Sequence, residues 1–190
     1  MESERTVVDT LVFGNIVIER TDCSVSARLE SDDSLVVTIE RSGPRTRKLI
    51  PIGTRDAACL SARVNERALG LALGRAWIGM RSYRVVVETE GRYLSLQPRD
   101  LETSAFLNGK PREIGKQFGE LTAHSDGTID VLWEVPRTVT LFGQSAEHDP
   151  PQPTAEELLI GYAVAAAFGT GGLSVVGLIG RLVEAVPFPV

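Results

Sequence analysis

The sequence predicts a mainly β fold, an antiparallel sandwich or barrel-like body, followed by a C-terminal hydrophobic helix or helical hairpin. Apolar and polar residues alternate along most of the first part of the chain, and clusters of turn-forming residues interrupt the alternation. No charged residue occurs from Leu158 to Gly180. We therefore expect a β-rich body (1–145), a Pro-rich linker (146–153) and a hydrophobic helical tail (154–190).

Two strands and a hairpin are expected at the start of the body. The runs Val7–Phe13 and Asn15–Glu19 predict the two strands. Every second residue is apolar in Cys23–Glu30 and again in Leu35–Glu40, and the turn-rich Ser31–Ser34 lies between them. This pattern is typical of a hairpin.

The middle of the body, Thr54–Met80, gives mixed signals. Thr54–Leu60 has the composition of a short helix start. Ala68–Gly74 alternates like a strand and contains two glycines, which destabilise a helix. We expect mainly strands in this stretch.

The sequence of the rest of the body again predicts strands. Ser82–Thr89 and Arg92–Gln97 flank Glu90-Gly91 and predict a second hairpin. Thr128–Glu134 is a strand that Pro136 ends, because proline cannot donate to a ladder. Arg137–Phe142 is the expected last strand.

The net charge of -5 is divided unevenly along the chain. Residues 1–137 hold 19 of the 20 basic and 20 of the 25 acidic groups, so the body is nearly neutral. The acidic start, Met1–Arg5, lacks the basic and apolar regions of a secretory signal, which favours a cytoplasmic location. An acidic chain gives no electrostatic reason to expect nucleic acid as a partner.

The linker and the start of the tail have clear local signals. Glu147–Pro153 has three prolines in its last four residues and should run extended. The following Thr154-Ala-Glu-Glu157 matches a capping box, in which the threonine hydroxyl and the glutamate carboxylate each accept from the other residue's amide. A helix should begin there.

The uncharged tail has several interpretations. Leu158–Gly180 is long enough for one span of a ~30 Å hydrocarbon core, which would anchor the protein to a membrane. Alternatively, helices over 155–168 and 173–186 form a hairpin packed on protein, or the segment lies in a membrane interface and inserts conditionally. The tail would otherwise complete the core of its own body. The small residues suited to close helix packing are Gly161, Ala165, Gly169, Gly177 and Gly180.

Groups that carry out chemistry are scarce. Cys23 and Cys59 are expected to be free thiols, and His124 and His148 to be surface residues. We therefore predict no catalytic residue, no metal site and no cofactor. The basic residues Arg41, Arg45, Arg47 and Lys48 surround a Gly-Pro turn and predict contact with an anionic lipid or phosphate surface; the alternative is a solvated hairpin tip.

Two segments resemble the second half of a forkhead-associated domain. They are Met80–Leu96 and Phe106-Leu-Asn-Gly-Lys110. The resemblance implies an eleven-stranded sandwich that binds phosphothreonine. The family's Ser-x-x-His motif is incomplete, since no histidine follows Ser82, and only Asn108-Gly109 matches the family's second motif.

Three classes of function follow from these observations. The first is a non-enzymatic adaptor or assembly subunit, oligomeric or partner-bound, attached through residues 158–186 to a membrane or a protein complex. The second is a β-sandwich module that binds a peptide or another ligand. The third is an enzyme whose site the sequence does not display.

Overall fold

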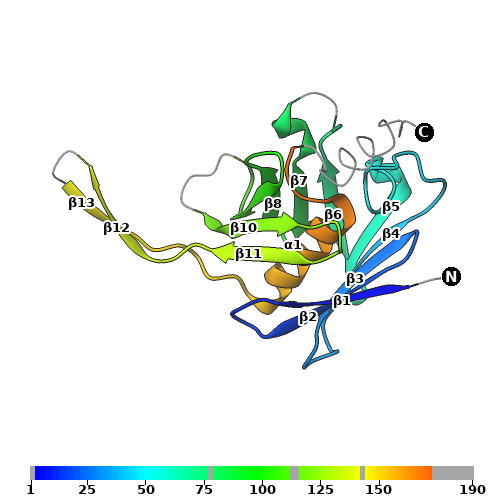
Figure 1. The fold of residues 1–190 in the computed structure, drawn as a ribbon, viewed down its shortest axis with the longest axis horizontal. Helices are drawn as coiled ribbons and strands as arrows, with labels where there is room; N and C mark the ends of the chain where they lie inside the picture. The colour runs from blue at the N-terminus through cyan, green and yellow to red at the C-terminus, as the bar shows by residue number, and fades with distance from the viewer. Residues whose placement is uncertain (1–2, 77–78, 112–115, 142–143, 173–190) are drawn as a thin grey trace, which may run out of the picture.

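The computed structural model describes residues 3–76, 79–111, 116–141 and 144–172 of the 190-residue chain (Figure 1). Eleven strands form one antiparallel sheet, in which each strand pairs with the next along the chain. The sheet curls into a nearly closed barrel. Its strands are β1 (Glu4–Asp9), β2 (Asn15–Arg20), β3 (Ser24–Leu29), β4 (Val36–Arg41), β5 (Leu60–Val64), β6 (Arg67–Leu73), β7 (Val85–Thr89), β8 (Arg92–Pro98), β9 (Thr103–Asn108), β10 (Gln117–Ala123) and β11 (Ile129–Trp133).

Sequence alternation determines which face of each strand is buried. In the β3–β4 hairpin, Val25 pairs with Ile39 and Ala27 pairs with Val37, and all four side chains lie in the core. Ser26 and Thr38, which pair between them, are only half-buried. One face of the sheet therefore lines the interior, and the other faces outward.

Helix α1 (Ala155–Phe168) lies inside the curled sheet. Every residue from Glu157 to Phe168 is buried, and the helix contacts β3, β4, β8 and β10. Figure 1 shows the helix in orange, enclosed by the strands. A helix that is apolar all round is stable only where apolar neighbours surround it, and the inner face of the sheet supplies them.

The start of α1 is fixed by the predicted capping box. Thr154 Oγ1 accepts from the Glu157 amide at 3.2 Å, and Glu157 Oε2 accepts from the Thr154 amide at 2.8 Å. Arg92 Nη1 pairs with the Glu157 carboxylate at 3.2 Å, and Arg67 Nη2 with the Glu156 carboxylate at 2.6 Å. These two ion pairs join the helix N-terminus to β8 and β6.

The end of α1 is bonded to the opposite end of the barrel. The Ile52 amide donates to the Ala167 carbonyl at 2.9 Å. Beyond the helix, Thr170 Oγ1 accepts from the Ala123 amide at 2.7 Å and donates to the Glu102 carbonyl. The helix is therefore held by backbone and side-chain bonds at both ends.

The structure confirms the mainly β prediction, and the sheet has the barrel-like arrangement. The first predicted helix has the bounds expected of it, 155–168, and it completes the core of its own body. The predicted membrane span is not found, because no helix of the described residues is long and apolar enough to cross a bilayer. The second predicted helix, 173–186, lies outside the described residues.

The segment from Thr54 to Met80, whose sequence signals were mixed, consists mainly of strands, as predicted. It contains β5 and β6, together with the 3-10 turn η1 (Ala57–Cys59). A second 3-10 turn, η2 (Met80–Tyr83), precedes β7, so the strand predicted from Ser82 begins only at Val85. The largest addition to the prediction is the strand β13 (Gln144–His148), which extends into the expected linker.

Candidate interaction surfaces

A two-stranded ribbon, here called the arm, follows the sheet. It consists of β12 (Arg137–Leu141) and β13 (Gln144–His148), and it pairs with none of the eleven described strands. Figure 1 shows it in yellow, projecting from the body beyond β11. An isolated two-stranded ribbon is marginally stable in water and needs a third strand or a packed face. Among the described residues, the arm therefore has no third strand to stabilise it.

The arm is well defined at its base. Arg137 pairs with His148 in the ladder, so the two chain ends of the arm lie side by side. The Glu134 amide donates to the Phe118 carbonyl at 2.8 Å, and Glu134 Oε1 accepts from Gln117 at 3.1 Å. These bonds join the start of the arm to β10.

An exposed apolar patch lies where the arm leaves the body. Leu132 is 70% and Val135 64% exposed. Trp133 Nε1 donates to the Thr10 carbonyl at 2.7 Å, which joins β11 to the β1–β2 turn; Leu11, the next residue of that turn, is 73% exposed. Exposed apolar residues grouped in this way are typical of a protein interface.

The second surface is the space between β1 and β11, here called the seam. In a sheet whose consecutive strands are all antiparallel, the first and the eleventh strand run in the same direction. No ladder joins β1 to β11 among the described strands. The barrel thus has two edge strands that face each other and run parallel.

The β1 edge carries backbone groups that have no ladder partner among the described strands. The Thr10 amide donates to the Gly14 carbonyl at 3.0 Å and continues the β1–β2 ladder. Because alternate residues of an antiparallel strand bond to the same neighbour, Val8 and Thr6 also bond to β2. The amides and carbonyls of Arg5, Val7 and Asp9 therefore point into the seam.

The β11 edge is its counterpart. Two hydrogen bonds show which residues of β11 bond to β10. The His124 amide donates to the Thr128 carbonyl at 2.9 Å, and the Glu134 amide donates to the Phe118 carbonyl. Even-numbered residues of β11 bond to β10. The backbone groups of Ile129, Val131 and Trp133 are left facing the seam.

Side chains close the seam at both ends. The Trp133–Thr10 hydrogen bond closes one end. At the other end, Gly127 in the β10–β11 turn lies against Thr6 and Glu4, whose side-chain oxygens would be 3.1 and 3.3 Å from an added Cβ. The Arg20 guanidinium lies against the same glycine, so no larger residue fits there without displacing it.

Two buried polar atoms near the seam have no hydrogen-bond partner among the described residues. They are the Tyr162 hydroxyl and Arg20 Nε. Burial raises the pKa of Tyr162, and the carboxylates of Asp9 on β1 and Asp130 on β11 add to the effect. The hydroxyl is therefore a neutral donor. Burial also lowers the pKa of Arg20, against the opposing effect of Glu4 and Asp126.

The predicted basic cluster is largely engaged within the protein. Arg41 is buried, and its guanidinium donates to Asp22 and to the Ile52 carbonyl at 2.7 and 2.8 Å. Arg45 donates to the Asp22 carboxylate and to the Pro51 carbonyl. The hydrogen bond from Arg45, with Arg41 nearby, lowers the pKa of Asp22.

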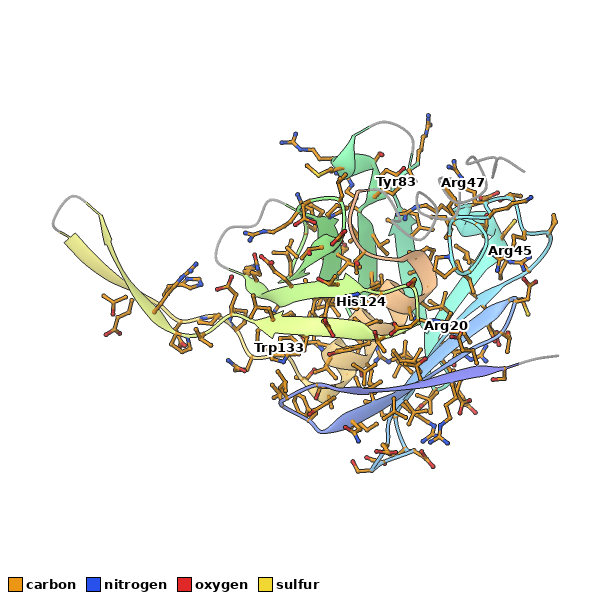
Figure 2. The ribbon with its side chains drawn as sticks, in the orientation of Figure 1. Arg20, Arg45, Arg47, Tyr83, His124 and Trp133 are labelled. Carbon is orange, nitrogen blue, oxygen red and sulfur yellow. The ribbon has the colours of Figure 1, made fainter. Side chains whose placement is uncertain are left out.

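The remaining two members of the cluster differ from each other. Arg47 donates to the carbonyls of Arg75 and Ala76, each at 3.2 Å, and Figure 2 places it near Arg45. Lys48 is exposed. The structure thus brings Arg41 and Arg45 together on Asp22, whereas Arg47 bonds to a different segment. Three of the four side chains donate to protein acceptors.

The structure describes three of the five residues predicted to suit close helix packing. Gly161 lies against the Phe106 ring, which an added Cβ would meet at 2.8 Å, and Ala165 is fully buried. Gly169 ends the helix with φ of +75°. Gly177 and Gly180 lie outside the described residues. The packing partner of Gly161 and Ala165 is the protein's own sheet.

Cys23 and Cys59 are free thiols, as expected, and both are half-buried. His124 Nε2 lies 2.9 Å from the exposed Asp130 carboxylate. In the part of the chain that the structure describes, no three His, Cys, Asp or Glu side chains are grouped to hold a metal ion.

Neither the arm nor the seam could be predicted from the sequence. Both depend on strand order and closure, whereas periodicity reports only which face of each strand is apolar. Trp133 and Arg20 gave no local signal beyond their places in strands. Comparison of the chain with known protein families, with curated proteins and with solved structures finds no match.

Proposed function

We propose that this protein is a non-enzymatic assembly subunit that joins a second copy of itself through the arm. The arm carries the proposal: it is a projecting ribbon whose two outer strand edges and both faces have no described strand beside them. Pairing with a neighbouring copy would give it the further strands that a stable sheet needs.

The chemistry around the arm supports assembly. The apolar residues at its base, Leu11, Leu132 and Val135, add buried area to any interface formed there. A symmetric dimer uses the same patch on both copies, so one arm and one apolar patch on each chain suffice. The helix residues first expected to attach the protein to a partner, 158–168, are buried and unavailable.

The test is removal of the arm. Because Arg137 pairs with His148, residues 137–148 can be replaced by a short Gly-Ser linker without separating Pro136 from Asp149. Size-exclusion chromatography with light scattering should show an oligomer for the full chain and a monomer for the shortened variant. A full chain that stays monomeric at about 100 μM, where specific interfaces of useful affinity are occupied, would overturn the proposal.

A second variant distinguishes a specific interface at the base of the arm from nonspecific hydrophobic association. Val135→Asp leaves the arm in place and puts a charge into the apolar patch, so it should weaken the oligomer at least fivefold. Leu49→Asp, at an exposed apolar residue in the loop between β4 and η1, is the matched control and should leave the oligomer unchanged. Circular dichroism checks that all variants remain folded.

A further inference from the structure

We propose that the seam is a binding site for one extended protein segment, which enters as a twelfth strand antiparallel to both β1 and β11. The proposed segment has apolar or small polar residues on its inner side and basic residues on its outer side. This site is separate from the arm. Backbone hydrogen bonds would supply the affinity for the partner, and side-chain contacts would supply the specificity.

The number of strands determines the direction of the guest. The two edges run parallel, so they would need a parallel ladder to bond directly to each other. One added strand that runs the opposite way makes an antiparallel pair with each edge. Twelve alternating strands close a barrel, whereas eleven leave its edges unmatched.

The unpaired backbone groups determine the length of the guest. Arg5, Val7 and Asp9 face it from one side, and Ile129, Val131 and Trp133 from the other. Because only every second residue of each edge faces the seam, these groups span five residues of each strand. A guest of about five residues matches these groups, and the contacts of Trp133 with Thr10 and of Gly127 with Thr6 must open for it to enter.

The Tyr162 hydroxyl favours a polar residue in the guest, because it lies near the seam: burial raises its pKa, and Asp9 on β1 and Asp130 on β11 lie close enough for both carboxylates to raise it further. The Tyr162 hydroxyl is fully buried and has no acceptor among the described residues. A buried donor without an acceptor costs about 1–3 kcal/mol. A serine, threonine or asparagine on the inner side of the guest would supply the acceptor.

The rim of the seam favours a basic guest. Its exposed carboxylates belong to Glu4, Asp9, Asp126 and Asp130. The exposed cation of β1 is Arg5, and the half-buried Arg20 guanidinium lies beside Glu4 and Asp126, so the four carboxylates leave the rim with an excess of negative charge. Hydrogen bonds from Thr128 lower the pKa of Asp126, which keeps that carboxylate ionised at neutral pH. Complementary charge fixes the choice of partner and speeds its association.

The experiment is a selection of random heptapeptides on the full chain, followed by amide hydrogen exchange. Selected peptides should be rich in Lys and Arg, and they should slow exchange at the amides of Val7 and Val131 at least tenfold. Failure to select any peptide, or protection confined to other parts of the sheet, would overturn the proposal. Amides that are already protected in the protein alone would also overturn it, since a segment of the same chain would then fill the seam.

Backbone variants test the mechanism of binding. Val7→Pro and Val131→Pro each remove an amide that faces the seam, and neither position donates to the existing ladder. Each should weaken peptide binding at least tenfold. Val7→Thr and Val131→Thr, which keep the amide and the branched shape, should bind as the unmodified chain does. Equal binding by the proline variants would contradict strand addition.

The variant without the arm tests peptide binding at the seam independently of the proposed self-assembly. Its seam is intact, so it should bind the selected peptides with unchanged affinity whatever its oligomeric state. Loss of peptide binding on arm removal would place the binding site on the arm and overturn the seam site.

Discussion

Gly169 and Gly171 have almost the same positive φ, +75° and +76°, but different surroundings. An added Cβ at Gly169 would meet nothing within 4 Å. At Gly171 it would fall on the backbone of Leu101 and Glu102. The first glycine is required by its conformation alone, and the second also by a close approach of two chain segments.

This pair gives a matched prediction. Gly169→Ala should lower the free energy of unfolding by about 1–3 kcal/mol, the cost of placing a side chain at φ of +75° and ψ of 175°, a region open essentially only to glycine. Gly171→Ala should cost at least about 1–3 kcal/mol more, because backbone atoms of Leu101 must move. Urea denaturation of both variants measures the difference, and equal losses would contradict the close approach.

Sequence alone could not distinguish these glycines. Both occur in Gly169-Thr-Gly-Gly172, and that run predicts the end of a helix without telling which glycine another strand touches. The same limit applies to Arg41. Its neighbours in the chain are basic and suggested an anionic surface, whereas its partners Asp22 and Ile52 approach only in the folded sheet.

At the scale of elements, the start of α1 is the feature that the sequence predicted most fully. The capping box uses contacts between residues three apart, so it needs no knowledge of the fold. The hairpins at 24–41 and 85–98 were predictable for the same reason. The strand β13 was not, because its residues Gln144–His148 lie beside three prolines and have low β propensity.

The capping box provides the prediction at this scale. Thr154→Ala should destabilise the protein by about 1 kcal/mol, because the Glu157 amide loses its acceptor. Thr154→Ser keeps the hydroxyl and should retain most of the stability. Thermal and urea unfolding of the two variants test this, and a loss as large for serine as for alanine would contradict the role of the hydroxyl.

At the scale of the whole molecule, the helix and the sheet form one core. The large side chains of α1 in that core are Leu158, Leu159, Ile160, Tyr162, Val164 and Phe168. Burial of each contributes about 1.5–3 kcal/mol. Their sum is comparable to the ~5–15 kcal/mol by which folded domains are usually stable.

A chain that ends at Pro153 should therefore show no cooperative unfolding transition, whereas the full chain should. Adding a peptide of residues 154–172 to the shortened chain should restore near-native circular dichroism if the sheet can close around it. A shortened chain that unfolds cooperatively on its own would show that the sheet does not need the helix. The sequence left this question open, because an uncharged apolar helix suits a membrane and a protein interior equally well.

The position of α1 in the chain has a consequence for biosynthesis. Each strand pairs with its predecessor, so the ladders of the sheet can form as the ribosome releases them. The helix that fills the sheet follows all eleven strands, and the inner faces of those strands stay without their core until it emerges. The nascent chain is thus most exposed to aggregation just before its helix appears. Codon changes that slow translation between β11 and α1 should lengthen that interval and lower the yield of folded protein.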